Sequence, residues 1–140
     1  MKINYYKVKL KKRFPLAISR GVRYDSENLF IRYEKDGIIG WGEAAPGETE
    51  GASTAEEVQK ELEKFVATGI EGESLQDLYD RSKELKIPPC AYAAIDIALW
   101  DWTAKKAGLP LYQILGFPKP NTPTSVTIGI NPPNIIKERI

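Results

Sequence analysis

The sequence predicts an α+β fold in which a three-stranded antiparallel meander is followed by a helical bundle. Apolar residues alternate with polar ones near the start of the chain, which is typical of half-buried strands, and later recur at helical spacing. The 140 residues, of which 42% are apolar and 28% charged, also fit a globular domain that can bury a sizeable core.

The strands are predicted from alternation and from one turn. Lys2–Lys11 and Asn28–Glu34 alternate between apolar and polar side chains, as a strand with one buried face does. Asp36 and Gly37 then lead into a third strand at Ile38–Glu43, because Asp-Gly suits the left-handed dihedrals of a two-residue hairpin turn. We expect the polar stretch that joins the first two strands to be a loop.

Two helices are predicted from capping signals that precede apolar residues at helical spacing. Ser53 is followed three residues later by Glu56, which is the spacing of a capping box. Ser74 and Asp77 repeat this spacing at the start of a second helix.

A third helix is predicted from Pro89 to Ala107. Proline is tolerated in the first turn of a helix, and Gly108 followed by Pro110 is a typical end. Apolar residues surround this helix on all sides, yet Asp96 and Asp101 interrupt it, so their role needs an explanation.

The chain changes character after the third helix. Phe117–Pro123 contains three prolines and is predicted to be a linker or domain boundary. Ser125–Ile130 lies in a β-branched run that predicts a strand, and a helix with Asn131 as its cap should follow. A strand that leads into a helix is how a domain of βα repeats begins.

Composition narrows the classes of function. The formal charge of +1 gives no reason to expect nucleic acid or a membrane surface as a partner. There is no apolar run long enough for a membrane span and no signal peptide, and the single cysteine, Cys90, is compatible with a reducing compartment, so we expect a cytoplasmic protein. The absence of histidine removes the commonest general base and metal ligand.

Three stretches together resemble the N-terminal region of the enolase superfamily, in its muconate-lactonizing and dipeptide-epimerase branch. The first is DGIIGWGEAAP, at Asp36–Pro46, and the third is TPTSVTIGINPP, at Thr122–Pro133. The second, AAIDIALWDWTAKKAGLPLYQILG at Ala93–Gly116, is the most specific, because an alanine-rich helix ending in Leu-Trp-Asp and followed by Gly-x-Pro-Leu recurs in that family.

This resemblance implies a domain organisation. Residues 1–120 would form an enolase-like N-terminal capping domain, and residues 121–140 the first strand and the start of the first helix of a truncated (β/α)8 barrel. A complete barrel needs about 250 residues, so the barrel would be a missing partner of this chain. Whether the chain is a natural fragment or a shortened one stays open, as does a homo-oligomeric state.

The resemblance also implies which residues meet the substrate. Arg20 and Arg23 lie where the family's cap reaches over the barrel mouth, and arginine forks suit a substrate carboxylate. Thr127 matches a barrel-strand position that can touch a dipeptide backbone, and Gly47–Ser53 resembles the second flexible cap loop. The alternative, a solvated loop whose arginines pair with neighbouring acidic residues, stays open.

Other carboxylates are expected to be structural. Glu43 ends a strand beside a loop, where it is either a site carboxylate or, as we expect, a residue bonded to backbone amides at the strand end. Asp96 and Asp101 point to different sides of the third helix. In the family this helix packs closely on the meander and the barrel through small residues, here Ala91, Ala93, Ala94 and Ala98. We assign no catalytic residue and no metal ligand to this chain.

By resemblance, the complete protein is an isomerase, a dipeptide epimerase or a muconate-cycloisomerase-like enzyme, that abstracts a proton α to a carboxylate. It would use Mg2+ and a small-molecule carboxylate or dipeptide substrate. The family's metal ligands and lysine bases belong to later barrel strands, so this chain alone is expected to bind no cofactor and to be inactive. An o-succinylbenzoate synthase-like dehydratase and a stand-alone interaction module with an exposed apolar face are the alternatives.

Overall fold

One antiparallel sheet organises the computed structural model, which describes residues 1–19 and 21–139. The strand order is β1-β2-β3, with β1 at Lys2–Ile18, β2 at Gly21–Lys35 and β3 at Ile38–Ala44. Asp36 and Gly37 both have positive φ, 54° and 75°, so the predicted tight turn joins β2 to β3. The predicted meander is confirmed.

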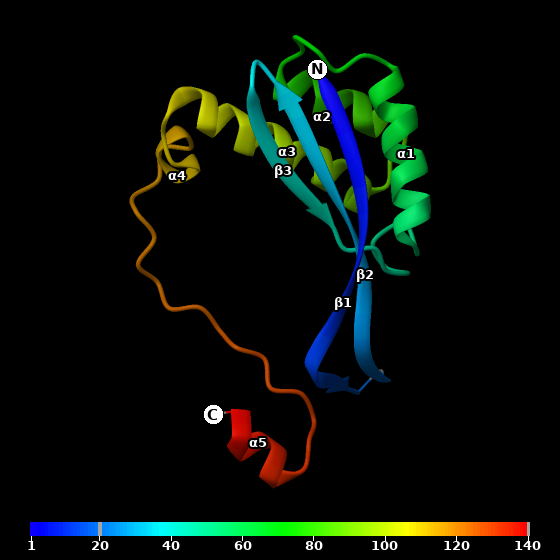
Figure 1. Cartoon of the computed structure of the whole chain (residues 1–140), viewed down its shortest axis with the longest axis vertical. Helices are drawn as coiled ribbons and strands as arrows, with labels where there is room; N and C mark the ends of the chain where they lie inside the picture. The colour runs from blue at the N-terminus through cyan, green and yellow to red at the C-terminus, as the bar shows by residue number, and fades with distance from the viewer. Residues whose placement is uncertain (20, 140) are drawn as a thin grey trace.

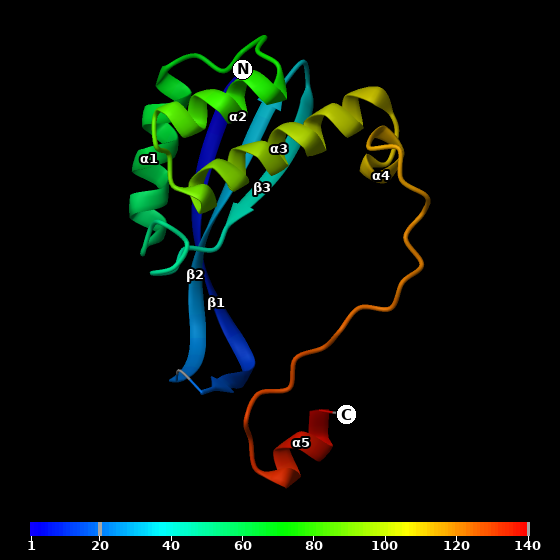
Figure 2. The same ribbon diagram turned by 180° about the vertical axis from the view of Figure 1, so that it is seen from behind.

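Three helices cover one face of this sheet (Figures 1 and 2). They are α1 at Ala55–Ala67, α2 at Leu75–Glu84 and α3 at Pro89–Ala107. The bounds predicted for the third helix are confirmed, and Gly108 ends it in the left-handed conformation with φ 67°. The core between the layers includes seven fully buried large side chains: Leu29, Ile31, Val58, Leu62, Phe65, Leu78 and Ile95.

The stretch expected to be a loop between the first two strands is instead the far end of a long hairpin. β1 continues to Ile18, and Ala17 pairs with Val22 of β2. The register shifts between Lys11 and Leu16, and Pro15 lies within that irregularity. Proline is tolerated at a bulge because no ladder hydrogen bond is lost there, so the strands resume beyond it.

Helix α3 lies unusually close to β3 because glycine and alanine face each other. A Cβ atom added to Gly42 would lie 1.9 Å from the Ala94 carbonyl oxygen, and one added to Gly40 would lie 2.1 Å from that of Ala98. The two glycines are two residues apart, and therefore on the same face of β3. The predicted role of small residues in α3 is confirmed for Ala94 and Ala98, whereas Ala93 lies on the side away from this contact.

The first capping box is shifted by one residue from the predicted pair. Thr54 rather than Ser53 is the N-cap of α1, and its hydroxyl accepts the backbone N–H of Glu57 at 3.1 Å. This register fully buries Val58. Ser74 caps α2 as predicted, accepting from the N–H of Asp77 at 3.0 Å.

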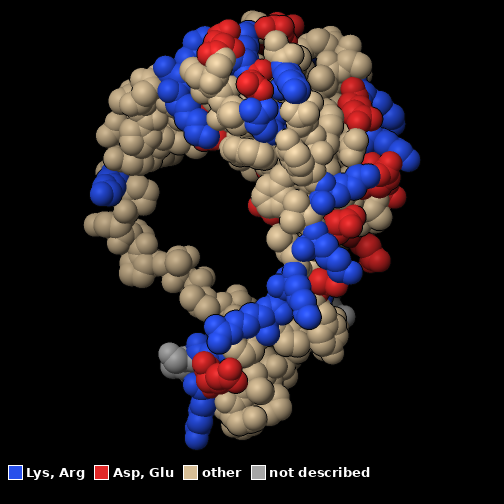
Figure 3. Space-filling model, in the orientation of Figure 1, with Lys and Arg blue, Asp and Glu red and all other residues tan. Residues whose placement is uncertain are grey.

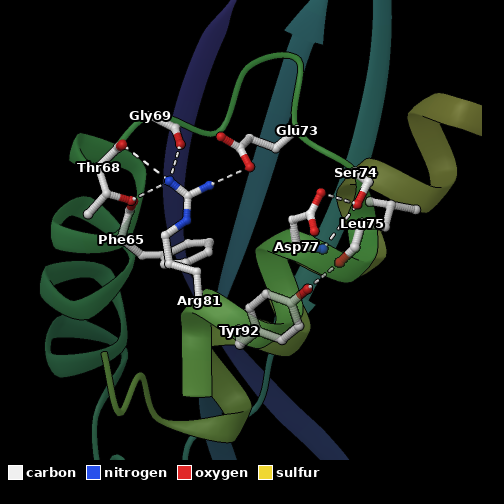
Figure 4. Close-up of polar contacts among 9 residues, drawn as sticks. All are labelled: Phe65, Thr68, Gly69, Glu73, Ser74, Leu75, Asp77, Arg81 and Tyr92. Atoms are coloured by element: carbon white, nitrogen blue, oxygen red, sulfur yellow. Dashed lines mark hydrogen bonds and ion pairs between the residues drawn. The ribbon is translucent and has the colours of Figure 1, made fainter. Parts of the chain in front are cut away.

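Arg81 ties α2 to the end of α1 (Figure 4). Its guanidinium donates to the carbonyl oxygens of Thr68 and Gly69 at 3.2 and 2.7 Å, and it pairs with Glu73 at 3.3 Å. The central carbon of this guanidinium, Cζ, also lies 5.9 Å from the centre of the Phe65 ring. Carbonyls at a helix C-terminus lack intrahelical partners, so this arginine satisfies groups that would otherwise be left unpaired.

The C-terminal part departs from the compact body. After α4 at Leu111–Ile114 the chain runs without helix or strand to α5 at Pro133–Arg139 (Figure 1). The strand predicted at Ser125–Ile130 is not formed, because no neighbouring strand pairs with it among the described residues. The predicted cap is also wrong: the side chain of Asn131 donates to the Gly129 carbonyl at 3.0 Å instead.

Candidate functional site

The far end of the β1–β2 hairpin meets the C-terminal segment. The backbone N–H of Ile130 donates to the Ala17 carbonyl at 2.8 Å. A Cβ atom at Gly129 would lie 2.8 Å from that same oxygen, so the absence of a side chain allows this approach. The contact joins two segments that are more than a hundred residues apart, and Figures 1 and 2 both show them together at one end of the molecule.

The candidate substrate-binding residues lie around this contact. Arg23 is exposed on β2 and pairs with Leu16 of β1, and because paired residues share a face it points to the same side as Leu16. Thr127 is exposed, and its carbonyl accepts from Arg139 at 3.1 Å. Arg20 lies outside the described residues. Within those residues no hydrogen bond joins Arg23 to Thr127.

The second predicted cap loop is held at its base. The N–H of Gly47 donates to the Ala52 carbonyl at 2.9 Å, and that of Cys90 donates to the Glu50 carbonyl at 3.4 Å. Gly51, with φ 85°, packs against the start of α3, where Pro89 lies 3.0 Å from the position of an added Cβ. The loop follows β3 and lies between the helical layer and the hairpin end (Figure 1). Its mobility stays a prediction.

Two of the three carboxylates interpreted as structural are held by neighbouring groups. Glu43 accepts from the side-chain amide of the buried Asn28 at 2.7 Å. Asp101 accepts from the backbone N–H of Trp41 at 2.8 Å and from Lys105 at 2.6 Å, while Lys105 also donates to the Ile39 carbonyl at 2.9 Å. The side chains of Asp101 and Lys105, both on α3, therefore pair with backbone groups on the free edge of β3.

Asp96 is different, because no basic side chain pairs with it among residues 1–19 and 21–139. Its one hydrogen-bond partner there is the hydroxyl of Tyr92, at 3.5 Å. Burial raises the pKa of the Asp96 carboxyl above its ordinary value, and the hydrogen bond from Tyr92 opposes this only in part. Burial and the nearby Asp96 charge also raise the pKa of Tyr92, to about 12.

An apolar groove, the α3–α4 groove, lies between the C-terminal half of α3, the α4 segment and Trp41 of β3. It has a volume of about 630 Å3, and its large apolar residues are Trp41, Ile97, Trp100, Leu109, Leu111 and Leu115. Ile97 and Leu109 are 49% and 48% exposed. Figure 3 shows that the segment after α4 is largely uncharged, whereas charged side chains gather over the sheet and α1. Helix α3 is thus apolar on a side that the described residues do not cover.

The described residues offer no metal centre. Across the two described ranges, no three histidine, cysteine, aspartate or glutamate side chains gather closely enough to hold an ion. Since Mg2+ prefers near-octahedral oxygen coordination, the residues present do not fit a magnesium site. In the same part of the chain, no helix combines the length and the apolar character that crossing a bilayer requires.

The sheet, the helices on one face and the glycine–alanine contact define an N-terminal capping domain of the enolase-superfamily type. The sequence model described as "Mandelate racemase / muconate lactonizing enzyme, N-terminal domain" matches residues 1–116, and the chain belongs to this family.

Relatives and solved structures agree with this assignment. A hydrophobic dipeptide epimerase of Flavobacteria bacterium (strain MS024-2A) is 75% identical over 140 residues, which are 100% of this chain and 40% of the relative. The chain thus spans less than half the length of the relative it matches. The dipeptide epimerase of Enterococcus faecalis V583, complexed with Mg and L-Leu-L-Tyr, has a TM-score of 0.85 at 28% identity, over 98% of this chain and 40% of that one. The N-succinyl Arg/Lys racemase of Bacillus cereus ATCC 14579 has a TM-score of 0.83 at 28% identity, over 98% and 39%.

Sequence reasoning missed two features of the site. The contact of Ile130 with Ala17 was not predicted, although a glycine within a β-branched run, Gly129, is a signal for close backbone approach. The long hairpin was also missed, because Pro15 and the residues around it interrupt the alternation.

Proposed function

We propose that the complete protein is a dipeptide epimerase that inverts the carbon α to a substrate carboxylate, with hydrophobic dipeptides as substrates. The observation that carries this proposal is the 75% identity, over the whole of this chain, to a hydrophobic dipeptide epimerase. The likeness to the E. faecalis enzyme complexed with Mg and L-Leu-L-Tyr supports it independently.

In this proposal, residues 1–120 are the capping domain and residues 121–140 begin a (β/α)8 barrel that the rest of the protein completes. The hydrogen bond from Ile130 to Ala17 supports this division, because it brings the proposed first barrel strand to the hairpin of the cap. The α3–α4 groove supports it too, since an apolar surface of this size needs a cover.

The residues of this chain would bind and enclose the substrate. Arg20 and Arg23 would hold a substrate carboxylate through charge-assisted hydrogen bonds, and Thr127 would contact the dipeptide backbone. The hairpin end and the loop at Gly47–Ala52 would close over the mouth of the barrel and exclude water. The base that removes the α-proton would come from outside this chain.

Mg2+ is the proposed cofactor of the complete enzyme, where it would stabilise the negative charge that develops on the carboxylate during proton removal. A dipeptide epimerase neighbour is complexed with Mg. Because the described residues do not fit a magnesium site, its ligands would lie in the remainder of the protein. The 140-residue chain by itself should neither bind Mg2+ specifically nor exchange an α-proton.

The proposal is tested with the complete protein in D2O. We expect deuterium to enter the α-position of L-Leu-L-Tyr, and we expect EDTA to stop the exchange until Mg2+ is restored. Arg23→Ala should raise KM about tenfold, because one charge-assisted contact is lost. Lys9→Ala, which removes an exposed charge from the same hairpin, should leave KM unchanged. Absence of exchange in every hydrophobic dipeptide would contradict the proposal.

Three alternatives have distinct outcomes. An N-succinyl amino acid racemase, favoured by the B. cereus neighbour, would exchange N-succinyl arginine faster than any dipeptide, whereas an o-succinylbenzoate synthase-like dehydratase would lose water from its substrate. A stand-alone interaction module would show neither reaction. Size-exclusion chromatography of this chain addresses the module, because an uncovered groove should make the chain self-associate.

A further inference from the structure

A second cavity lies between α2 and the N-terminal half of α3, whereas the α3–α4 groove lies along the C-terminal half of α3. This cavity, the α2–α3 pocket, has a volume of about 230 Å3, and its wall includes Tyr79, Lys83, Ile87, Tyr92 and Asp96. Tyr79 and Lys83 come from α2, and Tyr92 and Asp96 come from α3. Neither the family assignment nor the proposed function gives this pocket a role.

The carboxylate of Asp96 is incompletely satisfied. The hydroxyl of Tyr92 carries a single proton, and two acceptors compete for it: the carbonyl of Leu75 at 3.4 Å and Asp96 at 3.5 Å. Figure 4 shows this hydroxyl directed toward Leu75 at the start of α2. A half-buried carboxylate without a basic partner is costly, and a cation at this position would relieve the cost.

Aromatic rings line the same cavity. The ring centres of Tyr79 and Tyr92 are 5.8 Å apart with an interplanar angle of 62°. Tyr92 is held in place because its ring also packs edge-on against Phe65, at 5.8 Å and 86°. The negative face of an aromatic ring attracts cations, most strongly where water is partly excluded. Ring faces beside a carboxylate are a suitable environment for an organic cation.

We propose that the α2–α3 pocket binds an alkylammonium or guanidinium cation, with Asp96 as its charged partner and the rings of Tyr79 and Tyr92 beside it. Such a cation has two sources: a free amine in solution, or a lysine or arginine side chain from the remainder of the protein. Both present the same chemistry to the pocket.

Lys83 does not fill this role in the structure. Its ammonium lies 5.0 Å from the centre of the Tyr79 ring, and within the described ranges it forms no ion pair with Asp96. It lies on the pocket wall and would repel a second cation. Removing its charge should therefore strengthen binding rather than abolish it.

The test titrates n-butylammonium chloride and methylguanidinium chloride into the 15N-labelled chain and follows backbone amide shifts. Saturable shifts should appear in the segments around Asp96 and Tyr79, but not with potassium chloride or n-butanol. Asp96→Asn should weaken binding about fivefold, the size expected for one partly screened charge pair. Glu84→Gln, which removes an exposed carboxylate from the end of α2, is the matched control and should leave binding unchanged.

Two further variants keep the proposal testable if Asp96→Asn folds poorly. Tyr79→Leu should weaken binding about threefold, because it keeps the apolar wall and removes the ring face. Lys83→Met should leave binding equal or tighter. Equal binding by the parent chain and by both Asp96→Asn and Tyr79→Leu would overturn the proposal, as would shifts that potassium chloride reproduces.

The complete protein then identifies the source of the cation. If the remainder of the protein supplies the side chain, n-butylammonium will no longer bind, and Asp96→Asn will lower the Tm of the complete protein by several degrees. If the pocket takes a free amine, binding will persist in the complete protein and stay dependent on Asp96. This test is independent of the epimerase assay, so the two proposals can fail separately.

Discussion

The two ends of the β1–β2 hairpin differ sharply in how they are stabilised. The half next to β3 is covered by α3, and Leu29 and Ile31 in it are fully buried. Within the described residues, α1, α2 and α3 do not extend over the far half, and Val22 and Tyr24 there are 50% and 65% exposed. The same two strands therefore belong to the core at one end and are exposed to solvent at the other. The far half is held by strand pairing and by its contacts with the C-terminal segment rather than by burial in the core.

The largest effect is expected from a substitution that disrupts the packing of α3 on the covered half. Gly42→Val adds atoms where even a Cβ would lie 1.9 Å from the Ala94 carbonyl, and backbone on both sides cannot yield. We expect a loss of about 3 kcal/mol or more in the free energy of unfolding, measured by denaturant titration and circular dichroism. Gly47→Ala is the control, because its Cβ would meet only the flexible side chain of Glu50 at 3.4 Å. A stable Gly42→Val chain would show that α3 can move away from β3.

A smaller effect is expected at the free edge of β3. Asp101→Ala leaves the N–H of Trp41 without its 2.8 Å acceptor and Lys105 without its 2.6 Å partner. The free energy of unfolding should fall by about 1–2 kcal/mol, because the lost acceptor is charged but partly exposed. Glu84→Ala removes an exposed carboxylate and should change the free energy by less than about 0.5 kcal/mol. Equal effects of the two substitutions would argue against the edge contact.

A third substitution, at Asp96, is expected to stabilise the chain rather than destabilise it. Because burial raises its folded-state pKa, the folded chain holds this proton more tightly than the unfolded chain, and stability falls as the pH rises through the raised value. Tyr92 from α3, and Tyr79 and Lys83 from α2, are the titratable groups on the same cavity. Asp96→Asn cannot ionise, so Tm at pH 7 should rise by about 1–2 °C.

The control for the Asp96 prediction is the pH itself. Near pH 3 the aspartate is already protonated in the folded chain, so the advantage of Asp96→Asn should disappear there. A Tm that falls at pH 7 and stays unchanged near pH 3 would mean that a cation already neutralises this carboxylate in the isolated chain.

The smallest effect on global stability is expected at the far half of the hairpin. Gly129→Ala would place a Cβ 2.8 Å from the Ala17 carbonyl and separate the C-terminal segment from β1. The free energy of unfolding should change by less than about 0.5 kcal/mol, because the segment contributes little to the core. Hydrogen exchange at the Ile130 amide should nevertheless become faster. Unchanged exchange would show that this contact contributes nothing to the order of the segment.

Local chemistry explains what could be predicted from the sequence. The Asp36-Gly37 turn and the end of α3 at Gly108 depend on neighbouring residues alone, and both were identified. The contacts of Asp101 with Trp41 and of Ile130 with Ala17 join residues that are distant in the chain, so no periodicity reveals them. The prediction of a strand at Ser125–Ile130 was wrong. The residues there have a high strand propensity, but among the described residues no neighbouring strand pairs with them.

The candidate site was predicted less completely than the fold. Resemblance pointed to Arg23 and Thr127, and the structure brings their segments together. The pocket beside Asp96 could not be predicted, because it depends on how α2 packs against α3. A sequence shows that an aspartate lies in an apolar helix, but it does not show which side chains from another element surround it.

The contacts on β3 also bear on aggregation. An open sheet exposes two edge strands, and each can recruit a strand from another copy. On β3, Asp101 and Lys105 already occupy the N–H of Trp41 and the carbonyl of Ile39. β1 is the other edge, and its lysines Lys7, Lys9 and Lys11 are exposed. They would repel the same lysines of a second copy if its β1 were added as a neighbouring strand. Self-association of this chain should therefore be reversible and pass through its apolar groove, and it should not proceed to fibrils.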